Sequence, residues 1–93
     1  MSTGGWTFLT NHTHVLVCID REPGIPMRDI AARVGVTERA VQRIVGELVD
    51  GGYLARVRDG RRNAYTIDRS RGLRHPLEAG TSLDALLGLL DGD

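Results

Sequence analysis

The sequence predicts a small, mainly α domain with one β-hairpin, an α+β fold in which a three-helix core is followed by a further helix near the C-terminus. Two observations support this fold class. Apolar residues recur at helical spacing on both sides of Gly35, and Asp59-Gly60 stands between two extended segments. The chain has 93 residues, of which 41% are hydrophobic. We therefore expect a single globular domain that spans residues 1–93.

The first helix is expected at residues 11–21. Asn11 can cap its N-terminus, and Glu22-Pro23-Gly24 ends it. The next segment, Ile25-Pro26-Met27, is expected to be extended and to pair along an edge of the hairpin, where a proline is tolerated. The residues of this helix that we expect to be buried are Val15, Leu16, Cys18 and Ile19.

Two further helices are expected on either side of Gly35. The first spans residues 28–34 and buries Ile30, Ala31 and Val34. Gly35 can end it in a left-handed conformation, Val36 returns to the core, and Thr37 can cap the second helix, residues 37–50. The apolar residues of the second helix recur at positions 41, 44, 45, 48 and 49. This is a helix-turn-helix pattern.

The opposite face of the helix at residues 37–50 is polar and charged. Its side chains are of types that reach base edges and phosphates in a major groove. Arg28, at the start of the preceding helix, stands where a phosphate could bind. The sequence therefore predicts DNA contacts from Arg28, Thr37, Glu38, Arg39, Gln42 and Arg43.

Residues 53–67 are expected to form the hairpin, since Asp-Gly favours a two-residue turn with positive φ. In that register Arg58 lies opposite Arg61, and Leu54 lies opposite Tyr65. Directly opposed arginines repel each other unless a polyanion is near. The tip is therefore expected to contact phosphate or the minor groove through Arg58, Arg61, Arg62 and Asn63. In the alternative interpretation these arginines are only solvated, with their stems covering apolar surface.

Three helices followed by a basic hairpin are the arrangement of a winged helix-turn-helix. The chain resembles small prokaryotic transcriptional regulators of the MarR-like and ArsR-like type. The resemblance lies in a recognition helix (TERAVQRIV), a corner (DGGYL), a wing (DGRRNAY) and two flanks (WTFLTNH and RHPLE). It covers about residues 6–90 and implies a sequence-specific DNA-binding regulator, usually dimeric, without identifying an operator or an effector.

The last helix is expected at residues 82–90, with Thr81 and Asp84 as a capping pair. Its apolar stripe consists of Leu83, Leu86, Leu87 and Leu90 and is widened by Leu89. The stripe can pack on the chain's own first helix or on the same helix of a second copy. We favour the second arrangement, a homodimer, because terminal helices often supply the isologous contact of a dimer.

The net charge is zero, but the charges are segregated along the chain. Residues 53–75 carry +5, residues 76–93 carry −4 and residues 1–52 carry −1. The basic residues other than histidine are all arginine, which suits bidentate contacts. A high-GC coding bias would produce the same composition, and we favour that explanation. A basic wing and an acidic tail are expected, and overall neutrality keeps open a winged helix used for protein or RNA contact.

The single cysteine excludes an internal disulfide, and neither a secretory signal nor a bilayer-spanning segment is visible, so we expect a cytoplasmic protein without a membrane partner. No nucleophile–base pair or phosphate-binding loop supports an enzyme, and we expect no cofactor. His12, His14 and His75 lack metal-ligand spacing, although a metal- or small-molecule-responsive repressor is kept as an alternative. Gly46 lies inside the recognition helix. It either lowers the stability of this helix relative to alanine or allows another backbone to approach closely.

Overall fold

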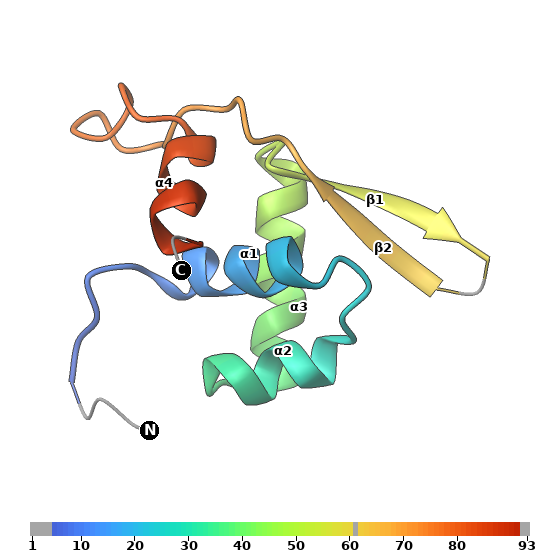
Figure 1. The fold of residues 1–93 in the computed structure, drawn as a ribbon. Helices are drawn as coiled ribbons and strands as arrows, with labels where there is room; N and C mark the ends of the chain where they lie inside the picture. The colour runs from blue at the N-terminus through green and yellow to red at the C-terminus, as the bar shows by residue number, and fades with distance from the viewer. Residues whose placement is uncertain (1–4, 61, 92–93) are drawn as a thin grey trace.

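The computed structural model describes residues 5–60 and 62–91, with the backbone alone at residues 59, 62 and 63. Its elements are α1 (Asn11–Arg21), α2 (Met27–Val34), α3 (Glu38–Asp50), β1 (Leu54–Asp59), β2 (Arg62–Ile67) and α4 (Leu83–Leu90), as Figure 1 shows. The predicted mainly helical fold with one hairpin is confirmed, and the element boundaries agree with the sequence analysis to within one or two residues.

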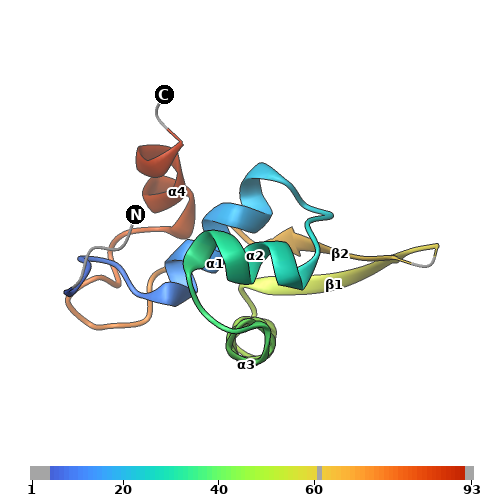
Figure 2. The ribbon, with the colours of Figure 1, turned by 90° about the horizontal axis from the view of Figure 1, so that it is seen from below.

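The helices form a compact group from which the hairpin projects (Figure 1). α1 passes across the middle of α3, α2 lies beneath α1, and α4 lies beside α1 on the side of the helical group away from the hairpin. Seen from below, α3 is viewed end-on and forms the outermost layer, with α1 and α2 on one side of it only (Figure 2). One long face of α3 is therefore left uncovered by the other helices.

The core lies between α1, α2, α3 and α4 and closes over the base of the hairpin. Its largest fully buried side chains are Val15, Ile19, Ile30, Val41, Ile44, Val45, Leu83 and Leu87. The apolar positions predicted for α1 and α3 are buried or half-buried. The helical periodicity of the sequence thus identified the faces that meet, because burial of apolar area is the main stabilising contribution in such a core.

The turn between α2 and α3 follows the predicted chemistry. Gly35 has φ +88°, and its N–H donates to the carbonyl of Ala31 at 2.8 Å. The N–H of Val36 donates to the same carbonyl at 3.1 Å. Thr37 caps α3 through its Oγ1, which accepts from the N–H of Ala40 at 3.0 Å. These contacts satisfy helix-end groups that would otherwise lack a partner and fix the angle between the two helices.

Two predicted caps are wrong. Asn11 is the first residue of α1 rather than its cap, and its Oδ1 lies 3.0 Å from Nδ1 of His14. At α4 the cap is Ser82, whose Oγ accepts from the N–H of Ala85 at 3.1 Å. Thr81 is too early to cap, because the chain is still extended at Ser82 (φ −81°, ψ 157°).

The segment Ile25-Pro26-Met27 is extended only at Pro26, and its predicted pairing with the hairpin is wrong. Ile25 donates its N–H to Glu22 in a turn, Pro26 is the N-cap of α2, and Met27 already belongs to the helix. In the described part of the chain the sheet has two strands. Ile25 is buried in the core instead, which explains why an apolar residue occurs in this connection.

The hairpin has a different register from the predicted one. Asp59 pairs with Arg62, Arg58 with Asn63, Arg56 with Tyr65 and Leu54 with Ile67. Gly60 (φ +65°) thus takes the first central position of the turn, and residues of opposite formal charge close it. The predicted register would have closed it with two arginines. The shift is an even number of residues, so each residue keeps its predicted face.

α4 contributes to the chain's own core. Leu83 and Leu87 are fully buried against it, so the expectation that the leucine stripe packs on a second copy is wrong for these two residues. Leu86 and Leu90 are half-buried, whereas Leu89 is 81% exposed. The stripe therefore has an inner half that completes the core and an outer half that faces solvent.

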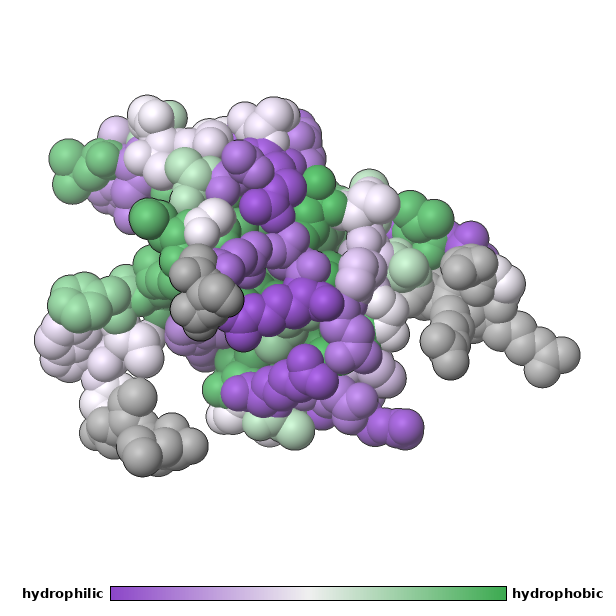
Figure 3. All heavy atoms as spheres, viewed as in Figure 1, coloured by the Kyte–Doolittle hydropathy of each residue, from purple (hydrophilic) through white to green (hydrophobic). Residues whose placement is uncertain are grey.

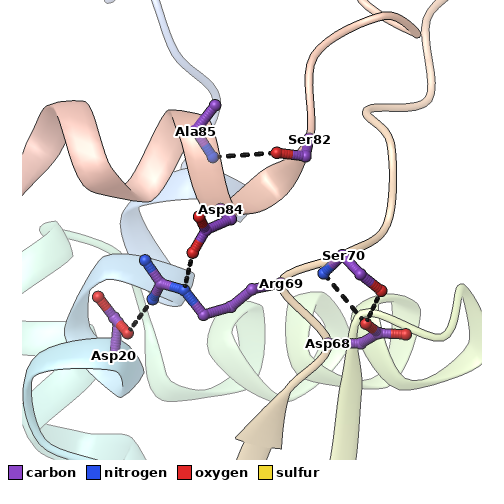
Figure 4. A network of polar contacts seen from close by, with 7 residues as sticks. All are labelled: Asp20, Asp68, Arg69, Ser70, Ser82, Asp84 and Ala85. Carbon is purple, nitrogen blue, oxygen red and sulfur yellow. Dashed lines mark hydrogen bonds and ion pairs between the residues drawn. The ribbon is translucent and has the colours of Figure 1, made fainter.

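An arginine after the hairpin fastens α4 to α1 (Figure 4). Nε of Arg69 donates to Asp84 on α4 and NH1 donates to Asp20 on α1, each at 2.6 Å. Burial raises the pKa of Asp20, and a hydrogen bond with the Asp91 carboxyl adds to this effect. Ser70 braces the segment, because its N–H and hydroxyl both donate to Asp68 and so lower the pKa of that carboxyl.

Candidate nucleic-acid interface

The uncovered face of α3 carries the side chains that the sequence analysis singled out. Glu38, Arg39, Gln42 and Arg43 are all exposed. Among the described residues, Arg39 and Gln42 have no side-chain hydrogen bond or ion pair. Their polar groups therefore face solvent on a rigid, well-capped helix. That is the condition under which a side chain can contact an external partner without breaking an internal contact.

Arg28 and Thr37 flank this face. Arg28 is exposed in the first turn of α2, and Thr37 is exposed at the N-cap of α3. The oxygen of Thr37 is already the acceptor of the cap bond, but its hydroxyl proton is still able to donate. The structure thus places Arg28 at the N-terminal end of α2 and Thr37 at the N-terminal end of α3.

Arg43 differs from its neighbours because it is already paired. Its NH1 lies 3.3 Å from both carboxylate oxygens of Glu47, one turn along α3. The Oε1 of Glu47 also lies 2.7 Å from Nε2 of His12 on α1. The hydrogen bond with His12, followed by the positive charge of Arg43, lowers the pKa of Glu47. Glu47 therefore connects α3 to α1 and keeps the side chain of Arg43 beside α3.

The sequence analysis did not single out Glu47. The i, i+4 spacing of Arg43 and Glu47 is a signal that could have revealed their pairing. The contact with His12 spans 35 residues and has no local signal.

The hairpin contributes two exposed arginines whose positions are described. Arg58 lies on β1 towards the tip, and Arg56 lies on the same face nearer the base. The Cζ of Arg56 lies 5.8 Å from the centre of the Tyr65 ring, within the range of a cation–π contact. Arg56 is a residue that the sequence analysis missed as a candidate, although alternate spacing with Arg58 could have identified it.

The remaining predicted wing residues cannot be placed in the same way. Arg61 lies outside the described residues, and Arg62 and Asn63 are described by their backbone in β2. The register corrects one argument made for this tip, because Arg58 is paired with Asn63 and not with Arg61. Repulsion between opposed arginines is therefore no longer a reason to expect a polyanion there.

The charge excess of residues 53–75 is not confined to the wing. Arg69 is paired with Asp20 and Asp84, and Nε of Arg71 lies 3.5 Å from Asp68. Asp84 belongs to the acidic C-terminal part, so the basic and acidic segments neutralise each other here. The sequence expectation of two segregated charged regions is corrected to a basic hairpin on a locally neutralised body.

Gly46 lies on α3 in open space. A Cβ at this position would meet no described atom within 4 Å. No backbone of the described chain therefore approaches α3 at Gly46, and the packing interpretation that the sequence left open does not apply within it.

Cys18 is buried in the core. Burial raises the pKa of its thiol, and the positive charges of Arg33 and Arg21 lower this pKa by a smaller amount. In the described ranges, no group of three or more His, Cys, Asp or Glu residues is arranged to hold a metal ion. Of the helices that the structure describes, none is both long enough and apolar enough to cross a membrane.

The comparisons with known proteins agree with this geometry. The MarR family model matches residues 7–62, which run from the segment before α1 to the start of β2. The chain belongs to the MarR family. The match covers the helix-turn-helix and the first strand of the wing, whereas the end of the wing and the flank RHPLE, on which the sequence resemblance was also based, lie beyond it. No curated protein matches the chain.

Two solved structures share the fold. One is the zinc-dependent MarR family transcriptional regulator AdcR in its Zn(II)-bound state, with 24% identity and a TM-score of 0.50; the match covers 68% of this chain and 45% of AdcR. The other is the PcaV transcriptional regulator from Streptomyces coelicolor with its natural ligand, with 23% identity and a TM-score of 0.54; the match covers 90% of this chain and 61% of PcaV. The chain thus spans less than two thirds of either protein.

Proposed function

We propose that this MarR-family chain is a sequence-specific DNA-binding transcriptional regulator that acts as a homodimer and not as an enzyme. The observation that carries the proposal is the uncovered face of α3, where exposed Arg39 and Gln42 have no partner among the described residues. The family membership and the fold shared with AdcR and PcaV, both transcriptional regulators, support it.

In the proposed complex α3 lies in the major groove. Arg39 and Gln42 have the chemistry for bidentate contacts, arginine with guanine and glutamine with adenine. Arg28 and Thr37 contact the phosphates that flank the groove, and Glu38 and Arg43 border the base contacts. The hairpin, which projects beyond α3, reaches phosphate or the adjacent minor groove through Arg58, Arg61, Arg62 and Asn63.

The proposed dimer uses the outer half of the α4 stripe. Leu89 is exposed, and Leu86 and Leu90 are half-buried. Figure 3 shows hydrophobic atoms gathered along the edge of the molecule where α4, the N-terminal segment and the loop before α4 lie. Apolar surface in this position supports an isologous contact, in which α4 of one copy packs on α4 of the other while Leu83 and Leu87 hold each α4 to its own core.

The test is binding to a duplex obtained by selection from a random pool, measured by fluorescence anisotropy. Arg39→Ala should weaken binding by about 1–3 kcal/mol and relax preference at one or two positions. Arg71→Ala is the matched control, because Arg71 pairs with Asp68 after the hairpin and belongs to neither the proposed DNA face nor the proposed dimer contact. Equal losses in both variants, or an unchanged sequence preference for Arg39→Ala, would contradict the placement of α3 in the groove.

A further inference from the structure

A half-open cavity of about 350 Å³ lies where α1, the last turns of α3 and the segment before α4 meet. Its accessible apolar wall is supplied by Leu9, Leu73 and Leu86, which are half-buried. Behind them lie the buried Leu16, Leu48 and Leu83, one each from α1, α3 and α4. The size falls within the range of about 300–1,000 Å³ that is usual for small-molecule sites. A molecule in this cavity would contact the recognition helix on the side away from the proposed DNA face.

Two opposite charges border the cavity. Arg74 and Glu78 both line it, both are exposed, and neither forms an ion pair or a side-chain hydrogen bond with another described residue. Their loop is held by its own contacts. The N–H of Glu78 donates to the His75 carbonyl at 2.8 Å, and the N–H of Leu77 donates to Nδ1 of His75 at 3.1 Å. The two charges thus stand on a braced loop at the rim.

A third charged group at the cavity, Glu47, is already engaged. It lies 2.7 Å from His12 and 3.3 Å from Arg43. Arg74 and Glu78 are therefore the charges at this site that an incoming ligand would meet without first breaking an internal pair.

Aromatic rings stand exposed beside the opening. Phe8 lines the cavity although 92% of its surface is exposed, and Trp6 contacts it edge-to-face with ring centres 4.9 Å apart. Large aromatic residues exposed next to a cavity gain buried area when a ligand occupies it.

We propose that this cavity binds a free α-amino acid with a large apolar side chain. The α-carboxylate pairs with Arg74, the α-ammonium pairs with Glu78, and the side chain lies on the leucine wall. A simple anion would pair with Arg74 alone and a simple cation with Glu78 alone, so each would make one charge contact where the zwitterion makes two. A polar side chain would be placed on apolar surface without hydrogen-bond partners.

The test is isothermal titration of the purified chain with L-phenylalanine and L-leucine. Three probes each lack one proposed feature: N-acetyl-L-phenylalanine lacks the ammonium, phenethylamine lacks the carboxylate, and glycine lacks the side chain. At least one of the two amino acids should bind at or below about 1 mM, and the three probes should bind at least about tenfold more weakly. Equal binding of N-acetyl-L-phenylalanine would overturn the zwitterion in favour of a simple anion.

Two variants tie the binding to this site. Arg74→Gln and Glu78→Gln should each raise the dissociation constant about tenfold or more, while the matched controls Arg33→Gln and Asp50→Asn, which lie away from the cavity, should not change it. Absence of heat from both amino acids, or equal effects of site and control variants, would overturn the proposal. Because no DNA is present, either result is independent of the proposed DNA binding.

Discussion

α3 and α4 are built alike but face different surroundings. Each is capped by a hydroxyl residue, Thr37 for α3 and Ser82 for α4. The hydroxyl oxygen accepts from the amide three residues later, at 3.0 Å in α3 and 3.1 Å in α4. Each buries one apolar side in the same core. The outward side of α3 is charged and polar, whereas the outward side of α4 carries Leu89, which is 81% exposed.

Helical periodicity thus locates the side of a helix that packs in the core, and the chemistry of its exposed side indicates what kind of partner it can bind. An outward polar face with unpaired donors suits a polyanion with donors and acceptors of its own. An outward leucine suits another apolar surface. The proposed division of roles, DNA contact by α3 and self-association by α4, follows from this contrast. Five predictions test it.

The largest effect is expected within α4 itself. Leu87→Ala should lower the free energy of unfolding by about 2–5 kcal/mol, because it leaves a cavity in the core. Leu89→Ala should change it by less than about 0.5 kcal/mol, measured by urea unfolding at a concentration where the chain is monomeric. Similar losses for both leucines would show that the inner and outer halves of the stripe do not differ.

Self-association is expected to depend on the outer half of α4. Leu89→Glu should raise the dissociation constant of the dimer by at least about tenfold, since it places a charge in an apolar contact. Gln42→Ala on α3 is the control and should leave association unchanged. Sedimentation equilibrium measures both, and a wild-type chain that is monomeric at micromolar concentration would refute the α4 contact.

The two caps should contribute similarly, since their geometry is similar. Thr37→Ala and Ser82→Ala should each lower the free energy of unfolding by about 1 kcal/mol, because an amide at the helix start loses its acceptor. Thermal unfolding followed by circular dichroism is the measurement. Thr37→Ser and Ser82→Thr serve as controls that keep the hydroxyl. A loss in these controls as large as in the alanine variants would mean that the hydroxyls do not act as caps.

The glycines inside the two helices give a smaller effect of opposite sign. A Cβ at Gly46 or Gly88 would meet no described atom within 4 Å. Gly46→Ala and Gly88→Ala should therefore each raise the free energy of unfolding by up to about 1 kcal/mol. If DNA binding by Gly46→Ala stays at the wild-type level, no groove wall approaches α3 closely there. A destabilised Gly46→Ala chain would contradict the open surroundings of this position.

The smallest effect concerns pH. The pKa of Glu47 is lowered in the folded chain by His12 and Arg43, so its contribution to stability is present above the ordinary glutamate pKa of about 4.3 and is lost as pH falls through the folded value. Glu47→Gln should therefore be less stable than the wild type near neutral pH. The two should converge in acid, as urea midpoints across the pH range will show. A constant difference at all pH values would exclude this origin.

Local sequence signals identified most of the fold. Gly35 and Thr37 determined the turn before α3, and the apolar spacing of α1 and α3 identified their buried faces. The errors occurred where two local solutions were equally permitted. Thr81 and Ser82 are adjacent, and each can cap a helix. A two-residue turn can be centred on Asp59-Gly60 or can have Gly60 as its first central residue. At α4, the bridge between Gly72 and Ser82 and the hydrogen bond from the N–H of Leu73 to the Thr81 carbonyl join both residues to the loop after the hairpin. A short window of sequence does not contain such contacts.

The candidate site was predicted in its positions but not in its pairing. The exposed residues of α3 follow from periodicity alone. The link from Arg43 through Glu47 to His12, and the capture of Arg69 by Asp20 and Asp84, join residues far apart in the chain. The same reason hid the cavity, because its walls come from segments that only the folded chain brings together.

The most direct test of the central claim, that α3 reads DNA, is the affinity of the wild-type chain for a selected duplex and for a scrambled duplex of the same composition across a range of salt concentrations. We expect the chain to bind the selected duplex at least about 10³-fold more tightly than the scrambled duplex at physiological salt. We also expect log affinity to fall linearly with log salt as phosphate contacts release counterions. Equal affinity for the two duplexes, or an affinity that does not change with salt, would contradict this claim.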